Sequence, residues 1–316
     1  MLGEMTIWYL FLAGAGAGAL LGAAVLEFLT PYAERCAEPR GTLADHPAAP
    51  FVAAEALRPF FGPAYGAGLA AVLLGMFCLM ADLGRPDRLL DLVLSPSLSF
   101  ISVGAYLLLA LVLCAALSAA AWSFGVSSIP RWLAGVARVG LVASALAVMA
   151  YTGLFLASLR AILFWYSPWL PALFAVSALS TGLGLLAGAV AIGGAPDRFA
   201  TTLRRVQRVD AVAIVAEALL LAALLITALA GDETARASAQ VLLVGPLAPT
   251  FWLFVVVIGL GVPLVGDLAG RADGSRLMLL ATACLLMGGF FLRWCVVRVG
   301  TAPDVAAFVA AAFGMG

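Results

Sequence analysis

Eight apolar windows of about 20 residues or more constrain the fold of this chain more than any other feature. A helix needs about 20 residues to cross the hydrocarbon core of a bilayer. Only helices and closed barrels satisfy all their backbone polar groups there. The windows therefore predict an all-α membrane protein with eight transmembrane helices, at about 5–29, 59–81, 100–122, 138–160, 168–193, 209–230, 247–267 and 277–298.

Composition and charge placement support this class. Hydrophobic residues make up 64% of the chain and charged residues 11%, whereas a soluble domain has about 25% charged residues. Eleven arginines fall in the connections after the odd-numbered spans, and five fall on the opposite side. Cytoplasmic loops carry the excess of basic residues, so we expect a multi-pass protein of the cytoplasmic membrane with both termini on the outer face.

Small residues on the first and fifth spans suggest an internal duplication. Leu10–Leu21 and Leu173–Leu185 both begin with Leu-Phe and then present small residues at i and i+4. Such a duplication would make the two four-span halves of the chain parallel copies of each other. The alternative is that small residues serve only to let helices approach closely in lipid.

A dense group of charges of both signs follows the second span. The segment MADLGRPDR, Met80 to Arg88, contains Asp82, Arg85, Asp87 and Arg88. In so apolar a chain, such a cluster at the end of a span favours a docking or site-forming edge over a solvated loop. The arginine distribution places it on the outer face, together with the aromatic segment Phe164–Trp169, which suits an interfacial belt or the mouth of a site.

Ionisable residues within or at the ends of spans are functional candidates, because burying them in a membrane is costly. The acids are Glu27, Asp210, Glu217 and Asp267. Asp210 and Glu217 are seven residues apart and should share a helix face, about 10 Å from each other. A proton relay from the cytoplasm is one interpretation, most of all for Glu217. The other is that these acids are interfacial or paired, with Arg138 and Arg293 as candidate partners.

The chain has one histidine, His46, in the first cytoplasmic loop, and five scattered cysteines without a CxxC pair. A membrane b-type haem needs two axial histidines, and cluster ligation needs grouped cysteines. We therefore expect no haem, no iron–sulfur cluster and no metal site in this chain. The arginines are balanced by acids, which gives no indication of nucleic-acid binding. An organic redox partner would have to bind on the face where electrons enter or leave.

Several segments, in order along the chain, are similar to the NrfD/PsrC family of membrane subunits of molybdopterin oxidoreductases. They are WYLFLAGAGAGALL (8–21), MADLGRPDR (80–88), SFISVGAYLL (99–108), YTGLFLASLR (151–160), SPWLPALFAVSALSTG (167–182), DAVAIVAE (210–217) and LRWCVVRVG (292–300). The resemblance implies two four-helix bundles, residues 1–161 and residues 162–316. It implies a haem-free subunit that binds quinone, such as menaquinone, near the outer face. It also implies an iron–sulfur subunit docked there, connected to a molybdopterin catalytic subunit.

The resemblance also assigns site residues. The family's quinone site corresponds to Tyr9 and Tyr151 in this chain. Some relatives have histidine where Tyr9 stands; a phenol hydrogen-bonds a quinone carbonyl but accepts a proton less readily. We expect Trp8 as a stacking wall and Asp82 and Arg160 in proton exchange.

Asp82, Arg85, Asp87 and Arg88 would face the iron–sulfur subunit. The alternatives are an interfacial belt for Trp8 and Tyr9, and a core tyrosine for Tyr151. The sequence thus favours a quinol-oxidising membrane subunit of anaerobic respiration, with proton coupling open and terminal substrate chemistry in another subunit.

Two other functions stay open. A membrane anchor without its own quinone site would share the same spans. A secondary transporter would show helices broken by Gly or Pro near the midplane, whereas the prolines here lie near span ends.

Overall fold

The structure is a computed structural model that describes residues 3–29, 49–83, 100–124, 131–159, 162–193, 197–268 and 275–300. Most of these residues are helical, and no strand occurs among them. The helices are α1 (Glu4–Leu29), α3 (Ala49–Leu83), α5 (Phe100–Phe124), α6 (Arg131–Ala157), α7 (Trp169–Ile192), η1 (Asp197–Phe199), α8 (Ala200–Ala230), α9 (Glu233–Leu243), α10 (Ala248–Thr250), η2 (Phe251–Gly261), α11 (Val262–Leu268) and α12 (Ser275–Val299).

Eight helices in the described part of the chain are long and apolar enough to cross a membrane, which confirms the prediction of eight spans. The chain is a multi-pass membrane protein. Two spans begin six or more residues earlier than the apolar windows indicated, because α6 and α8 continue through arginine-bearing turns. These spans run from Trp132 to Ala157 and from Ala200 to Ala230.

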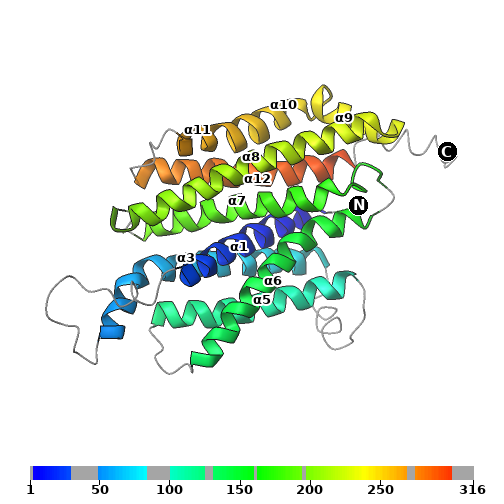
Figure 1. Ribbon diagram of the computed structural model, residues 1–316. Helices are drawn as coiled ribbons and strands as arrows, with labels where there is room; N and C mark the ends of the chain where they lie inside the picture. Colours follow the sequence, from blue (N-terminus) through cyan, green and yellow to red (C-terminus); the bar gives the residue numbers. More distant parts are fainter. Residues whose placement is uncertain are drawn as a thin grey trace.

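Helices α1 and α7 lie at the centre of the bundle, between the other spans (Figure 1). Helix α1 packs against α3, α6 and α7, and α7 packs against α8 and α12 as well. The two central helices approach most closely at Gly18 and Gly182, where a Cβ on Gly182 would lie 2.5 Å from the Cα of Gly18. The small residues noted on both spans therefore pack directly against each other, as close approach in lipid requires.

Span seven is not a regular α-helix. Residues Phe251–Gly261 are wound as a π-helix between α10 and α11. This segment packs against α12 at Gly259, where a Cβ would lie 2.6 Å from the Cα of Gly288. Long π-helical segments are rare, and π-type windings often accompany functional sites.

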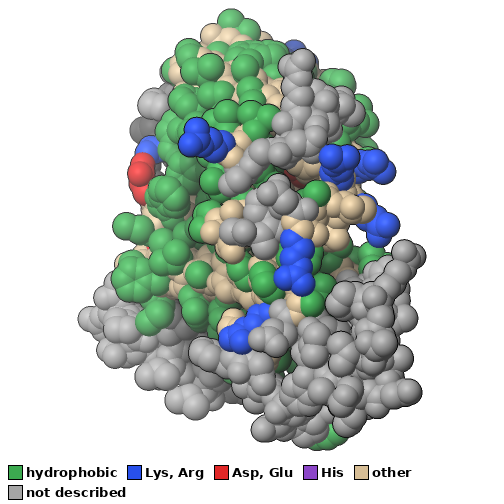
Figure 2. All heavy atoms as spheres, turned by 90° about the vertical axis from the view of Figure 1, so that its left-hand side faces the viewer, with side chains coloured by type: hydrophobic (Ala, Val, Ile, Leu, Met, Phe, Trp, Pro, Cys, Tyr) green, Lys and Arg blue, Asp and Glu red, His purple; other side chains and the backbone are tan. Residues whose placement is uncertain are grey.

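The bundle has two chemically different ends. The arginine-rich end is where α1, α5 and α7 stop and α6, α8 and α12 start; Figure 2 shows arginine side chains spread over this face. The opposite end, where α1 starts and α3 and α6 stop, is called the amino end below. There the segment before α7 is anchored by Trp165, whose indole nitrogen donates to the carbonyl of Val296 at 2.8 Å.

Candidate functional site

The predicted quinone residues meet at the amino end. Tyr9 on α1 and Tyr151 on α6 are both buried, and their phenol groups are near enough to interact electrostatically. Trp8 is 42% exposed, and its ring centroid lies 4.3 Å from that of Phe290. Two hydrogen-bonding phenols from different helices thus lie close together, and the indole of the adjacent Trp8 packs toward α12.

A glycine on a third helix makes room for the Tyr151 ring. A Cβ on Gly104 of α5 would lie 2.6 Å from Cε1 of Tyr151 and would also collide with its hydroxyl oxygen. Any side chain at this position would displace the phenol. The segment SFISVGAYLL therefore contributes to the site through the absence of a side chain.

Asp82 lies next to the start of α1. Its carboxylate accepts a hydrogen bond of 2.6 Å from the hydroxyl of Thr6, and it borders Gly3. An ion pair between Arg298 and Glu4 connects α12 to the same end. Asp82 thus belongs to the amino end, as does the tyrosine pair.

Five predicted residues are not described at side-chain level. Arg85, Asp87, Arg88 and Arg160 lie outside the described residues, and Asp267 is described only as part of α11. Their predicted roles in partner contact and proton exchange stay predictions.

A second polar site lies in the interior, between α7, α8 and α12. Arg293 is 0% exposed, the largest fully buried side chain of the described residues. Its Nη1 donates to the carbonyl of Gly289 at 2.9 Å and to the hydroxyl of Ser177 at 3.3 Å. The carboxylate of Glu217 lies near enough to interact with that hydroxyl and with Arg293. Ser177 therefore bridges a buried cation and a buried acid.

Aromatic rings and glycines enclose the Arg293 guanidinium. It lies over the rings of Phe174 and Phe11, 5.3 and 5.8 Å from their centroids. A Cβ on Gly14 would lie 3.1 Å from its Nη2. Its Nε has no hydrogen-bond partner in the described part of the chain. The arginine is thus held by cation–π contacts and by backbone carbonyls. Ser177 lies between it and Glu217.

Asp210 and Glu217 lie on the same buried face of α8, as their spacing indicated. Glu217 also borders a cavity of about 10 Å³ between α7, the π-helix and α12, together with Ser180, Thr181 and Gly259. A cavity of that size holds about one water molecule. The hydroxyl of Ser180 is fully buried and has no partner among the described residues. Polar groups therefore continue beyond Glu217 toward span seven.

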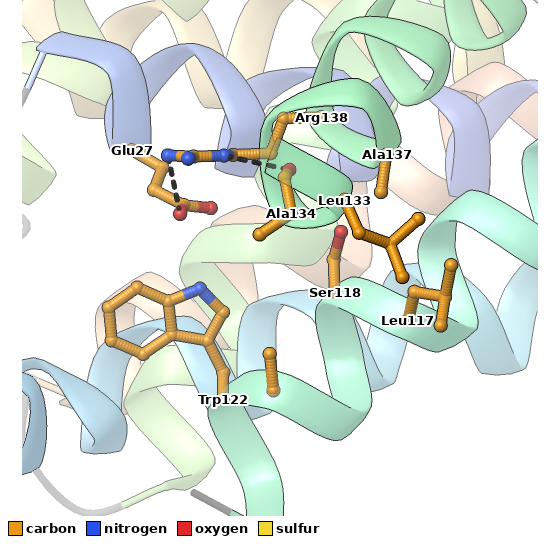
Figure 3. A pocket seen from close by; sticks show the side chains of 9 residues that line it. Glu27, Leu117, Ser118, Trp122, Leu133, Ala134, Ala137 and Arg138 are labelled. Atoms are coloured by element: carbon orange, nitrogen blue, oxygen red, sulfur yellow. Dashed lines mark hydrogen bonds and ion pairs between the residues drawn. The ribbon is translucent and has the colours of Figure 1, made fainter. Parts of the chain in front are cut away.

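A third polar site lies at the arginine-rich end (Figure 3). Glu27 accepts a hydrogen bond of 2.6 Å from Tyr65 and forms an ion pair of 3.2 Å with Arg138. Arg138 also donates to the carbonyl of Ala134 and lies over the ring of Phe28. A cavity of about 40 Å³ separates this pair from Ser118 and Trp122. The arrangement has the form of a paired, interfacial acid, the alternative that the sequence left open.

Sequence reasoning missed several features of these sites. Ser177 falls in the run Leu173–Leu185, which indicated only small residues for close packing, although it lies between Arg293 and Glu217. The π-helix was not predicted, because the run 251–261 reads as an ordinary apolar span. No group of three or more metal-ligating residues occurs among the residues described.

Comparison with known proteins agrees with the resemblance. Residues 64–303 match the family model described as polysulphide reductase, NrfD. Protein NrfD of Escherichia coli K12 is 33% identical over 153 residues, 48% of each protein. A polysulfide reductase chain from Wolinella succinogenes is 31% identical over 162 residues, 49% of this protein and 50% of the relative. The matched segments span about half the length of these curated relatives.

Proposed function

We propose, on the premise that this chain belongs to the polysulphide reductase NrfD family, that it binds quinone or quinol at the amino end of the bundle. The chain is a membrane subunit of a redox complex. The observation that carries the proposal is that Tyr9, Tyr151 and Asp82, from three helices, lie at one end of the bundle, where Tyr9 and Tyr151 interact.

The donor set fits a quinone headgroup. Two phenols can hydrogen-bond carbonyl or hydroxyl oxygens, and the indole of Trp8 offers an aromatic face at a partly exposed position. Quinol, when bound, supplies two electrons and two protons. Tyr9 and Tyr151 orient the headgroup, and Asp82 and Arg160 exchange protons with the solvent side.

The arginine-rich end faces the cytoplasm in this proposal, because basic residues gather on that side. The amino end, Asp82 and both termini then lie on the outer face of the cytoplasmic membrane. We further propose two four-helix bundles, residues 1–161 and 162–316. In support, α1, α3, α5 and α6 pack around one another, and α12 packs against α7 and the π-helix.

The proposed partner subunits would dock on the outer face, next to the quinone site. The Wolinella succinogenes relative is named as one chain of a polysulfide reductase, so that protein is part of a larger enzyme. We propose an iron–sulfur subunit docked against Asp82, Arg85, Asp87 and Arg88, connected to a molybdopterin catalytic subunit. The quinone, menaquinone in this proposal, would then pass electrons to the partner without a chain of redox cofactors across the bilayer. The protein would act as the quinol-oxidising subunit in anaerobic respiration.

Removal of the phenol hydroxyls tests the site. In the intact complex, Tyr9→Phe and Tyr151→Phe should each raise the apparent KM for quinol about three- to tenfold, the effect of one lost hydrogen bond. The double variant should abolish quinol-linked turnover. The matched control is Tyr65→Phe, which removes a buried phenol at the opposite end. A membrane anchor without a quinone site would leave quinol turnover unchanged in all of these variants.

Purification and charge reversal test the partner surface. The complex should copurify with iron–sulfur and molybdopterin subunits, and Arg85→Glu should weaken assembly or electron transfer before it affects folding. Isolation of the protein alone with substrate flux would instead favour a secondary transporter. Unchanged assembly and activity in Arg85→Glu would leave Met80–Arg88 as a solvated loop.

Proton coupling is a further part of the proposal. Glu217 and Asp210, with Asp267 toward the arginine-rich end, would form a half-channel that connects the cytoplasm to the interior. The shared buried face of the first two acids supports this. Glu27, which the sequence grouped with these acids, stays outside the half-channel as the partner of Arg138. Glu217→Gln should lower the number of protons moved per electron and leave electron transfer largely intact. An unchanged ratio would remove Glu217 from the path.

A further inference from the structure

A large cavity lies at the arginine-rich end, far from the tyrosine pair. It has a volume of about 700 Å³, within the range of sites that hold organic ligands, and is lined by α1, α3, α7, η1 and α8. Helices α1 and α7 form its floor, and α3 and α8 form its sides. Phe60 and Phe199, whose ring centroids are 5.1 Å apart, connect α3 to η1 at one edge. We call this cavity the α3/α8 groove.

The groove is apolar along its length and open on one side. Its floor includes the buried residues Leu21 and Leu183, whereas Val209 and Leu29 at its rim are 53% and 71% exposed. Exposed apolar residues on a spanning helix face lipid rather than water. The groove is therefore reached from the side, through the bilayer.

Its polar end is positively charged. Thr202 and Arg205 are the polar residues of the lining, and no hydrogen bond or ion pair joins Arg205 to another described residue. Arg204 and Arg208 flank it on the same helix, and Arg198 precedes them on η1. Figure 2 shows arginine side chains across this face of the molecule.

We propose that the α3/α8 groove binds an anionic phospholipid from the leaflet at the arginine-rich end, with an acyl chain in the groove and the headgroup phosphate at Arg205. An apolar slot beside a cationic rim complements an amphiphile with a negative head. A basic residue at the membrane surface contributes about 1 kcal/mol of attraction to anionic lipid. A neutral quinone headgroup has no need of such a rim. The proposal does not depend on the quinone site.

Native mass spectrometry of the purified complex tests it. The probes are phosphatidylglycerol and phosphatidylcholine with identical acyl chains, added in detergent micelles. Phosphatidylglycerol should be retained more tightly. Arg205→Gln should weaken its retention about fivefold, the ratio that corresponds to roughly 1 kcal/mol, without weakening that of phosphatidylcholine. Arg276→Gln, at an exposed arginine of the same end outside the lining, should have no effect.

A second pair of variants tests the groove itself. Val209→Trp places a large ring in the groove and should reduce the number of lipids retained by one. Val212→Trp, three residues further along α8, 70% exposed and outside the lining, should retain the full number. Both variants keep an apolar residue toward lipid, so a thermal unfolding scan should show similar stability.

Three outcomes would overturn the proposal. One is equal retention of the two lipids by the unaltered complex. Another is unchanged phosphatidylglycerol retention in both Arg205→Gln and Val209→Trp. The third is displacement of a copurified quinone, instead of a phospholipid, by Val209→Trp.

Discussion

Glu27 and Glu217 are both buried acids paired with an arginine, but the two pairs are built differently. Glu27 contacts Arg138 directly, and the Arg138 side chain is 22% exposed near the arginine-rich end. Glu217 is connected to Arg293 through the hydroxyl of Ser177, and Arg293 is fully buried. Glu27 has a second fixed partner in Tyr65, whereas Glu217 borders a cavity the size of one water molecule.

The difference separates an acid that holds helices together from an acid that can exchange a proton. An acid with two strong donors, one of them an arginine that reaches the interface, is stable with a permanent charge, because water screens part of the cost. Glu217 has one neighbouring hydroxyl, that of Ser177, and borders a cavity large enough for a water molecule. It therefore has fewer contacts to break when it changes charge. Glu27 therefore suits a clamp between α1, α3 and α6, and Glu217 suits a group whose charge can change.

The largest expected effect comes from Arg293. Arg293→Met should lower stability by about 3–5 kcal/mol, because it leaves a buried acid without its cation. Thermal unfolding in detergent measures this. Adding Glu217→Leu to Arg293→Met should restore part of the loss, since two coupled residues are not additive. Additive losses would show that the pair is not coupled.

Glu217→Gln should cost less, about 1–3 kcal/mol, because the amide keeps the shape and polarity of the side chain but no longer balances the charge of Arg293. If Glu217 exchanges protons and Glu27 does not, Glu217→Gln should also change the number of protons moved per electron. Vesicles with a pH-sensitive dye measure this number. A variant that loses stability alone would make Glu217 a clamp like Glu27.

Glu27→Gln should lower stability by about 1–2 kcal/mol, less than a fully buried pair, because Arg138 is partly exposed and can turn toward headgroups. Proton movement per electron should be unchanged. Arg138→Gln is the matched partner variant. A reduced proton ratio in either variant would place the Glu27 pair on the proton path and remove the distinction.

Tyr65→Phe should have the smallest effect, about 1 kcal/mol, the value of one hydrogen bond. Its thermal unfolding temperature should fall slightly. The Glu27–Arg138 pair should persist. A double-mutant cycle of Glu27→Gln and Arg138→Gln, made in the Tyr65→Phe variant, should still show a coupling energy between them.

The sequence predicted some parts of these sites and not others. Charged residues in apolar runs identified Glu27, Glu217 and Arg293, because few charges occur in spans without a reason. It did not assign the pairs, since Glu27 and Arg138 are 111 residues apart and either arginine was a possible partner. Ser177 and Tyr65 gave no signal as polar partners, because each occurs in a run that reads as packing surface. Gly104 could not be identified, because its role depends on the ring of Tyr151.

By itself the sequence determined that this protein spans a membrane eight times, because a bilayer core leaves an apolar helix as the one arrangement that satisfies an isolated segment's backbone. It also determined where arginine gathers. Only the tertiary structure decided which acid meets which arginine and that α1 lies against α7 at Gly18 and Gly182. It alone showed that span seven is wound as a π-helix. Those features arise from contacts between helices far apart in the sequence, where small residues set the distance and no local pattern records the partner.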